Sequence, residues 1–245
     1  MASQPPDRWP HAVLDLRSRR LKALKIERLL NLSARPQPIR MLEIGTGSGG
    51  IAHYFASHPT IAYQVTAVDV VDQRQLRKGF DFRQVADTTL PFSNDRFDVV
   101  ITNHVIEHVG NLSAQRHHLS EMHRVMNPHA IAYLAVPNRW ALVEPHYRLA
   151  FLSWIPRYLR GPFLRMMHRG VHYDCEPLSL RVLENLLKDA GFKYRNLGAR
   201  ALRETLSIEG DKGVAANIAA KLSDSFLDRL ASFIPTLIYR LELKS

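Results

Sequence analysis

The sequence has a single cysteine, Cys175, which excludes an internal disulfide framework and any metal site built from several cysteines. Long hydrophobic runs are also missing. The longest, Ala130–Val136, has the length of a strand and falls far short of the roughly 18 residues that cross a bilayer. Residues 1–11 contain three prolines and no apolar segment of the kind that a secretory signal needs. Together these absences predict a cytoplasmic protein.

Acidic residues are too few to balance the basic ones, and the net charge is +10. Residues 1–40 carry nine basic and three acidic side chains, residues 41–150 carry nine and ten, and residues 151–245 carry fifteen and ten. Two basic ends flanking a near-neutral middle favour anionic partners such as phosphates, nucleic acid or a membrane surface. Arginines spread over solvated faces would give the same totals, so the charge alone does not name the partner.

The residue pattern predicts an α/β fold. With 46% hydrophobic and 23% charged residues, the 245-residue chain is long enough for one domain with its own core. Residues 14–32 predict an amphipathic helix with a basic outer face, which ends before Pro36. Beyond it, strands predicted at 39–44, 63–70, 82–86, 97–102 and 131–137 alternate with helices at 51–57 and 113–126. Several of these strands are apolar throughout, which indicates a mostly parallel sheet covered by helices on both faces.

The alternation pauses after Pro137, and residues 138–178 are predicted to form an irregular insertion with short helices. A helix at 179–190, a strand at 192–197, a helix at 214–233 and a last strand at 235–243 follow. A terminal strand so soon after another is expected to run antiparallel, at one edge of the sheet. The single domain then consists of a basic helix (1–38), a core (39–137), the insertion (138–178) and a C-terminal completion of the sheet (179–245).

The sharpest local feature is the glycine-rich run from Glu43 to Gly50, between a predicted strand and a predicted helix. Gly45, Gly47 and Gly49 permit positive φ and a close approach of the backbone to a ligand. The helix that follows offers free N–H groups beside that ligand. This run fits a methyl-donor site and a dinucleotide site equally well.

The set of carboxylates in and after this run favours a methyl donor over a dinucleotide. Asp69 ends the second strand, where an acid can accept both hydroxyls of a ribose, and both kinds of site have an acid there. Asp87 follows the third strand, where it can accept the exocyclic amine of an adenine, a role that dinucleotide enzymes do not need. Glu43 would repel a pyrophosphate, but it suits a ligand that carries an ammonium and a sulfonium.

These segments resemble the class I S-adenosylmethionine (SAM)-dependent methyltransferases, in particular the small-molecule branch that includes the quinone-biosynthesis enzymes. The similar stretches are Met41–Gly49, Val65–Val70, Phe82–Phe92, Phe97–Val109 and Leu119–Pro128. The resemblance implies a Rossmann-like sheet of seven strands, with the last strand inserted antiparallel and SAM lying over the carboxyl ends of the strands. The segment Asn127-Pro128-His129-Ala130 departs from the glycine-ended turn that the family usually has there.

The resemblance also implies a role for each site residue. Gly45, Gly47 and Gly49 would surround the methionyl part of SAM, and Glu43 would hold its amino-acid portion. Asp69 would bind the ribose, Asp87 the adenine, and Asn103 would lie near the reacting end. The full set of predicted donor-binding residues is Glu43, Gly45, Thr46, Gly47, Gly49, Asp69, Val70, Asp87, Thr88 and Asn103.

SAM carries its own leaving group, so the protein needs chiefly to align an acceptor, exclude water and, for a hydroxyl, remove a proton. The candidate bases are His108, His146 and Tyr147, with His104, His172 and Tyr173 as further candidates. Glu107 and His108 also suit a structural pair beneath the rim of the sheet. His104, Glu107 and His108 match a Glu-x-x-Glu-His metal signature only in part, so no metal site is predicted.

The insertion combines arginines with aromatic and aliphatic residues, and residues 145–173 contain no acid. This mixture predicts an acceptor pocket roofed by the segment, with an anionic membrane surface or a lipid- or phosphate-bearing acceptor as partner. A lid that packs its apolar face on the sheet remains an alternative.

The leading prediction is SAM-dependent methylation of a small-molecule, lipid-linked or sugar-linked acceptor at oxygen, in the cytoplasm or at the inner membrane face. An RNA or DNA methyltransferase is a second reading, although strand four lacks the Asn/Asp-Pro-Pro-aromatic turn used for base amines. A non-catalytic SAM-binding partner subunit is a third, and an NAD dehydrogenase fits least. The acceptor and the oligomeric state are not predicted.

Overall fold

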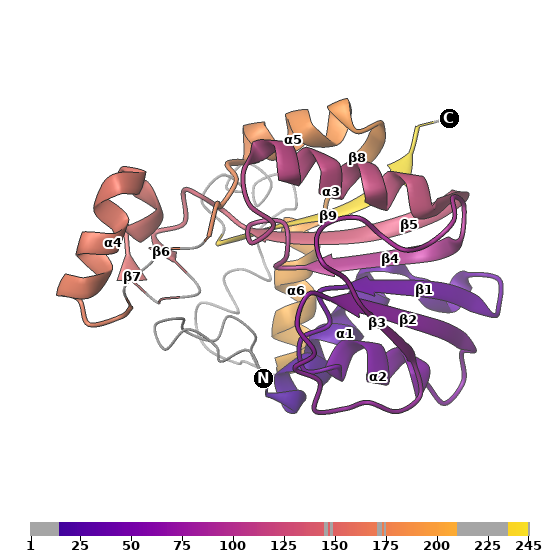
Figure 1. The fold of residues 1–245 in the computed structure, drawn as a ribbon. Coiled ribbons are helices and arrows are strands. Elements are labelled where there is room, and N and C mark those ends of the chain that lie inside the picture. The colour runs from indigo at the N-terminus through magenta and orange to yellow at the C-terminus, as the bar shows by residue number, and fades with distance from the viewer. Residues whose placement is uncertain are drawn as a thin grey trace.

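A computed structural model describes residues 15–144, 147, 149–170, 173, 175–209 and 235–244. At its centre is a seven-stranded sheet in the order β3-β2-β1-β4-β5-β9-β8 (Figure 1). These strands are β1 (Ile39–Ile44), β2 (Tyr63–Asp69), β3 (Asp81–Gln84), β4 (Phe97–Asn103), β5 (Met126–Pro137), β8 (Phe192–Asn196) and β9 (Thr236–Leu243). Strand β9 runs antiparallel to both of its neighbours, β5 and β8, and the other neighbouring strands of this sheet pair in parallel. The prediction of a Rossmann-like, mostly parallel sheet is confirmed.

Helices cover both faces of the sheet, which explains the apolar strands. On one face lie α1 (Leu16–Leu30), α2 (Gly50–Ala56) and α6 (Gly198–Glu209), and on the other α3 (Leu112–Val125) and α5 (Leu180–Asp189) (Figure 1). Successive residues of one strand enter different cores: Tyr133 of β5 packs on the α1 side and Leu134 on the α3 side. Both side chains are fully buried, as a strand covered on both sides requires.

Helix α1 forms where the sequence predicts it. The Asp15 carboxylate caps its start by accepting from the N–H groups of Arg17 and Ser18, and Asn31 ends it in the left-handed conformation. Helix α6, which packs beside α1, was not predicted from the sequence. Its start is marked by Asn196, whose side chain accepts from the N–H of Gly198 at 2.7 Å. The helix predicted at 214–233 lies outside the described residues.

The prediction that the last strand lies at an edge is wrong, although its antiparallel direction is right. Strand β9 pairs with β5 on one side and β8 on the other, so β8 is the edge strand. The side chains explain this order. β9 buries Leu237, Ile238, Tyr239 and Leu241, whereas β8 exposes the charged Lys193 and Arg195. Charged, short strands are tolerated at an edge, and apolar ones are covered.

The unusual Asn127-Pro128-His129 segment extends β5 toward α3, so that the helix runs into the strand at Met126. Two hydrogen bonds of the Asn127 side chain hold the backbone here, where the family usually has a glycine-ended turn. Its amide donates to the carboxylate of Asp98, and its oxygen accepts from the N–H of His129 at 2.9 Å. The β4–β5 register shifts at this point, between Phe97 and Val99. A side-chain cap and a bulge therefore make the turn without glycine.

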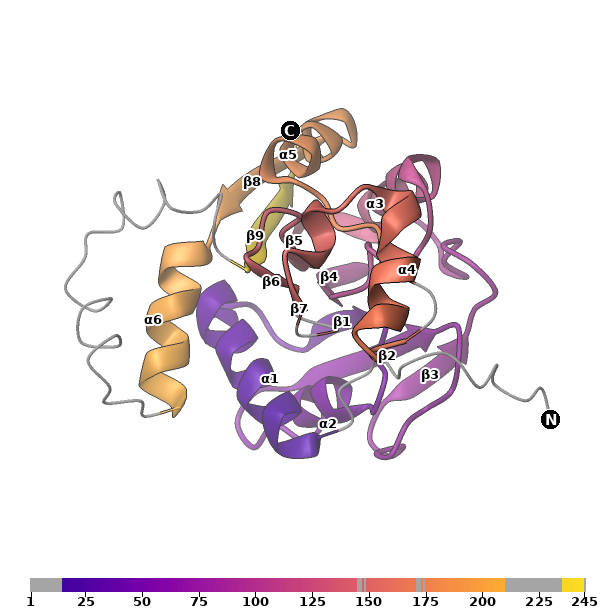
Figure 2. The same ribbon diagram turned by 90° about the vertical axis from the view of Figure 1, so that its left-hand side faces the viewer.

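The insertion after β5 forms a separate lobe at the carboxyl ends of the parallel strands (Figures 1 and 2). It contains the hairpin strands β6 (Val143–Glu144) and β7 (Leu149–Ala150), a 3₁₀ turn (Leu152–Trp154) and α4 (Arg157–Met166). Leu149, Leu152, Leu164 and Cys175 belong to its own small core. The returning chain is tied to the end of β4, because the N–H of Glu176 donates to the carbonyl of Glu107 at 2.8 Å.

In the part of the chain that the structure describes, no helix is both long and apolar enough to cross a membrane.

Candidate functional site

The turn between β1 and α2 requires glycine at defined positions. Gly45, Gly47 and Gly49 have φ angles of 78°, 52° and 78°, in the left-handed region that other residues rarely adopt. A Cβ atom on Gly45 would overlap the side chain of Val105, and one on Gly49 would overlap the backbone carbonyl of Leu76. The turn is therefore tightly packed from behind, and its conformation is fixed by neighbouring elements as well as by its own residues.

Asp69 lies against this turn. Strands β1 and β2 are neighbours in register, so the end of β2 reaches the level of the turn. One carboxylate oxygen of Asp69 accepts from the backbone N–H of Gly47 at 2.8 Å, and the other accepts from the N–H of Val71 at 3.3 Å. The structure thus brings together the two features that the sequence analysis placed 22 residues apart.

Glu43 is a buried carboxylate beneath the turn. It accepts a hydrogen bond from the hydroxyl of Thr46 at 2.8 Å. Burial raises the pKa of Glu43 to about 8, while the hydrogen bonds from Thr46 and from the backbone of Ala52 and the nearby Arg19 guanidinium act in the opposite direction. At neutral pH the carboxyl group is therefore mostly protonated, and a cationic group bound beside it would favour its ionised form.

Arg19 of α1 is a site residue that the sequence analysis missed. The Cβ of Arg19 lies only 2.6 Å from the position that a Cβ on Gly50 would occupy. Helix α1 therefore packs directly against the start of α2. Burial lowers the pKa of the Arg19 guanidinium, and Glu43 in its ionised form acts in the opposite direction. The sequence places Arg19 on a basic helix face, and only tertiary packing reveals which of those arginines faces the turn.

The loop after β2 is fastened to the glycine turn, which the sequence pattern also did not predict. The carbonyl of Ser48 accepts from the N–H groups of Gln75 and Leu76 at 2.9 and 3.1 Å. Within the loop, the Arg74 guanidinium lies 3.7 Å from the centre of the Phe82 ring and pairs with Asp72. Val70, the residue after Asp69, is 53% exposed. Its side chain therefore offers an apolar surface on which a flat ring such as adenine can pack.

Asp87 and Thr88 follow β3. The backbone N–H of Val85 donates to the carbonyl of Asp69 at 3.0 Å, so this loop starts beside the end of β2. The Asp87 carboxylate is exposed and accepts from the N–H of Thr89 at 2.7 Å, which lowers its pKa. The Thr88 hydroxyl lies 2.6 Å from Nδ1 of His117. Both side chains make these local contacts, and their roles toward a donor stay predictions.

The end of β4 carries a second group of polar residues. The side-chain oxygen of Asn103 is buried and has no hydrogen-bond partner among the described residues. His104 has a φ of 59°, and its Nδ1 lies 3.3 Å from Oε1 of the fully buried Glu107. Nε2 of His108 lies 3.9 Å from the same oxygen. Glu107 therefore orients two histidines at the carboxyl end of β4.

A third histidine lies below this group. His118 of α3 is buried, with Nε2 3.4 Å from the Thr102 hydroxyl. Burial lowers the pKa of His118 to about 4, so this side chain is neutral near pH 7. His118 thus supports the end of β4 as an uncharged polar group.

The insertion contributes residues opposite the end of β4. Sγ of Cys175 lies 3.8 Å from Nδ1 of His108. Tyr147 is buried, its N–H donates to Glu144 at 2.7 Å, and its ring packs on that of Tyr173 at 5.6 Å. Two predicted base candidates, His146 and His172, lie outside the described residues. Among the residues that are described, no cluster of three His, Cys, Asp or Glu side chains could hold a metal ion.

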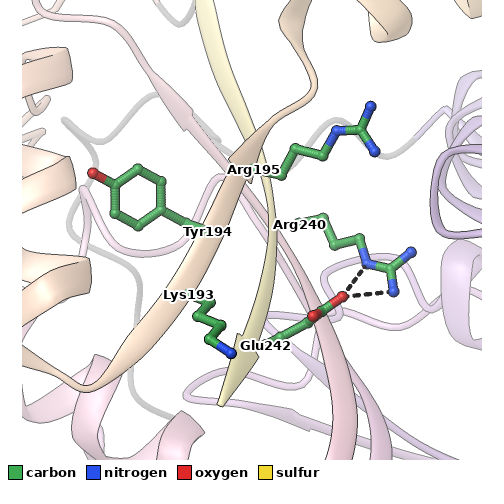
Figure 3. A pocket seen from close by; sticks show the side chains of 5 residues that line it. All are labelled: Lys193, Tyr194, Arg195, Arg240 and Glu242. Atoms are coloured by element: carbon green, nitrogen blue, oxygen red, sulfur yellow. Dashed lines mark hydrogen bonds and ion pairs between the residues drawn. The ribbon is translucent and has the colours of Figure 1, made fainter. Parts of the chain in front are cut away.

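A separate hollow of about 300 Å³ lies on the last two strands and is lined by Lys193, Tyr194, Arg195, Arg240 and Glu242 (Figure 3). Arg240 pairs with Glu242 at 2.7 Å. Because β4 and β5 separate β9 from β1 in the sheet, this hollow does not belong to the site at the glycine turn.

The residues at the glycine turn fit SAM in charge and in polarity. Buried Glu43 suits an ammonium group, and Asp69 is a carboxylate placed beside backbone N–H groups. The Ser48 hydroxyl and the Asn103 side-chain oxygen are both buried without a partner in the described part of the chain, one in the turn and one at the end of β4. Such unpaired polar atoms are costly unless a ligand meets them.

Comparison with known proteins supports this fit. A family profile described as a methyltransferase domain matches residues 16–197, so the chain belongs to the methyltransferase-domain family. The chain is 30% identical over 180 residues to a ubiquinone biosynthesis O-methyltransferase of Azorhizobium caulinodans, and 24% identical over 181 residues to one of Parvibaculum lavamentivorans. Each match covers 67% of this chain and 63% of the relative, so the chain spans less than two thirds of the length of these relatives.

Solved structures share the fold. A SAM-dependent methyltransferase from Methanosarcina mazei matches with a TM-score of 0.55 and 17% identity, over 88% of this chain and 98% of its own. A phosphoethanolamine N-methyltransferase from Haemonchus contortus, bound to S-adenosylhomocysteine (SAH), matches with a TM-score of 0.51 and 17% identity, over 90% of this chain and 52% of its own. The recognised class I methyltransferase fold is thereby confirmed.

Proposed function

We propose that the chain transfers a methyl group from SAM to an oxygen atom of a small-molecule, lipid-linked or sugar-linked acceptor. The observation that carries this proposal is the contact between the Gly47 N–H and the Asp69 carboxylate. It holds a carboxylate against the glycine turn, and this supports a contact between Asp69 and the ribose of the donor. The choice of oxygen is supported by the two relatives named as ubiquinone biosynthesis O-methyltransferases.

Each donor group has a proposed partner in the site. Gly45, Gly47 and Gly49 line the methionyl part, and Glu43, oriented by Thr46, receives its ammonium. Asp69 accepts from the ribose hydroxyls. The adenine lies along Val70, with Asp87 and Thr88 at its edge. Asn103, at the end of β4, offers its unpaired oxygen near the reacting end.

SAM supplies an activated methyl group, so the proposed work of the chain is alignment and proton removal. The proposed base is His108, with its neighbour His104 as the second candidate at the end of β4. Buried Glu107 stabilises the imidazolium that forms when either histidine accepts a proton. Tyr147 and His146 remain candidates from the insertion, as base or as contacts to the acceptor.

The insertion is the proposed roof of the acceptor pocket. It stands at the carboxyl ends of the strands (Figure 2), and Cys175 approaches His108 from its side. The proposal places the enzyme in the cytoplasm with contact to the inner membrane face, because this lobe is basic and partly apolar at its surface.

The decisive experiment incubates the chain with methyl-labelled SAM and host extract, which is then separated into lipid, glycan, nucleic acid and small-molecule fractions. We expect label in the lipid, glycan or small-molecule fraction, bound as a methyl ether that resists mild base. Label in nucleic acid would instead support the RNA or DNA methyltransferase. Donor binding without any labelled product would support the non-catalytic subunit.

Asp69→Asn should weaken donor binding about thirty-fold. The variant keeps the size of the side chain but removes the charge that accepts from ribose hydroxyls, and hydrogen bonds to a charged group contribute about 2 kcal/mol. Calorimetric titration with SAH measures the change. Asp81→Asn is the matched control, since Asp81 is an exposed acid at the start of β3 and does not contact the glycine turn in the proposed site. Equal affinities of the two variants would contradict the proposed ribose contact.

A further inference from the structure

The outer surface of the insertion is unusually apolar for a part of the molecule that faces water. Of the thirteen large hydrophobic side chains that are exposed in the described residues, nine lie between Trp140 and Met167. Tyr158 and Met166 of α4 are 78% and 66% exposed. The nine are Trp140, Leu142, Val143, Phe151, Trp154, Tyr158, Leu159, Met166 and Met167, and we call their surface the lobe face.

Part of the lobe face is a fixed aromatic cluster. The Trp140 and Trp154 rings meet edge to face at 5.8 Å, and the Phe151 and Trp154 rings at 5.2 Å. The indole N–H of Trp154 donates to the carbonyl of Ala141 at 3.0 Å, and the N–H of Phe151 donates to the carbonyl of Leu142 at 2.8 Å. These contacts hold the rings in place while their outer surfaces remain exposed. The cluster is thus preformed for a partner.

Arginines surround the apolar residues. Arg139, Arg165 and Arg169 are exposed, as is Arg157, which pairs with Glu176 at 2.9 Å, and residues 145–173 contain no acidic residue. On α4, Tyr158, Arg165 and Met166 are exposed, while Arg160 and Leu164 are buried on the inner side. Basic side chains beside exposed tryptophan, tyrosine and aliphatic residues are the composition of a surface that lies in the headgroup region of an anionic bilayer.

We propose that the lobe face docks the enzyme on a membrane that contains anionic lipids. Charge complementarity selects this partner. A second copy of the chain would bring two sets of arginines together, and nucleic acid would pair with the arginines but leave Met166 and Leu142 without an apolar partner. The lobe that carries this face stands at the carboxyl ends of the parallel strands (Figure 1), so in this proposal an amphiphilic acceptor anchored in the bilayer presents its polar hydroxyl to the end of β4. In this respect the inference rests on the proposed function.

Flotation of the full chain with vesicles tests the docking without any donor or acceptor. We expect binding to vesicles of mixed phosphatidylcholine and phosphatidylglycerol at low salt, loss of binding at high salt, and none to phosphatidylcholine alone. Arg165→Gln and Arg169→Gln should each reduce the partition coefficient about five-fold. The double variant Tyr158→Ser/Met166→Ser should reduce it roughly thirty-fold, because both side chains lose their insertion into the headgroup layer.

Matched controls separate the lobe face from general basic charge and general surface hydrophobicity. Lys193→Gln/Arg195→Gln removes two exposed charges at the edge strand, and Leu112→Ser/Val182→Ser removes two exposed apolar side chains from α3 and α5. Both controls should bind vesicles like the unmodified chain. Equal losses in controls and lobe variants, or absence of binding to the anionic vesicles, would overturn the proposal. So would self-association, measured by sedimentation, that the lobe variants abolish.

The docking and the proposed function fail independently. Calorimetry with SAH should give the same donor affinity for Tyr158→Ser/Met166→Ser as for the unmodified chain, because both residues lie on the lobe and outside the glycine turn. Absence of vesicle binding by the unmodified chain, with donor binding intact, rejects the docking alone. Absence of donor binding in the unmodified chain, with vesicle binding intact, rejects the methyl-transfer proposal alone.

Discussion

Replacement of Gly49 with alanine should reduce donor affinity at least a hundred-fold and destabilise the fold by roughly 3 kcal/mol. Two costs add. Gly49 has a φ of 78°, which an alanine adopts at a cost of about 1–2 kcal/mol. The new Cβ would also overlap the carbonyl of Leu76, whose N–H holds the loop after β2 on Ser48. The collision can be relieved only if this loop moves off the turn.

Gly79→Ala separates the two costs. Gly79 also has a positive φ, of 92°, but a Cβ there would meet only the Cβ of Ala56 at an ordinary 3.4 Å. The control therefore carries the backbone cost of a positive φ but has no collision that would move the loop off the turn. Thermal unfolding followed by circular dichroism and titration with SAH provide the two readouts. If Gly79→Ala weakens donor binding as much as Gly49→Ala, the contact between turn and loop does not shape the donor site.

Local sequence patterns predicted the parts of this fold that depend on near neighbours. Strand β1 has the predicted bounds, because an apolar run between Pro38 and a glycine turn has little freedom at either end. The glycine turn after β1 and the end of β2 at Asp69 also lie where they were predicted, and these two strand ends meet in any sheet where β1 and β2 are parallel neighbours. Their contact at Gly47 follows from topology and needs no detail of packing.

Features that depend on distant partners were not predictable in this way. The place of β9 depends on which of two strands takes the edge of the sheet. The residues of β9 alone do not predict this, because the exposed charges that favour the edge are on β8. Arg19 is a similar case. It belongs to a basic helix face with several equivalent charges, and only long-range packing shows that Arg19 lies against the start of α2 and interacts with Glu43.

The unmodified protein should lose stability relative to Glu43→Gln as the pH rises from about 4.5 to about 8. Burial raises the pKa of Glu43 from 4.5 to about 8, so within this range the folded chain holds a proton that the unfolded chain has released. The free energy of unfolding then falls with increasing pH, by an amount on the order of 5 kcal/mol over the whole range. Glutamine has no proton to lose, and it can still accept from Thr46.

Urea unfolding of both proteins without donor, at several pH values between 5 and 9, measures this difference. We expect similar stabilities near pH 5 and the largest advantage of Glu43→Gln at pH 8 and above. Parallel pH profiles would show that Glu43 is not held protonated.

Donor binding should reverse this protonation. An ammonium group beside Glu43 favours the carboxylate, so SAM binding near pH 7 should release close to one proton, and its affinity should rise with pH up to about 8. Titrations in buffers with different ionisation enthalpies count that proton directly. Glu43→Gln should bind more weakly and release none. Proton release that persists in Glu43→Gln would assign it to another group, and the buried carboxylate would then be a structural partner of Thr46 rather than the receptor of the ammonium.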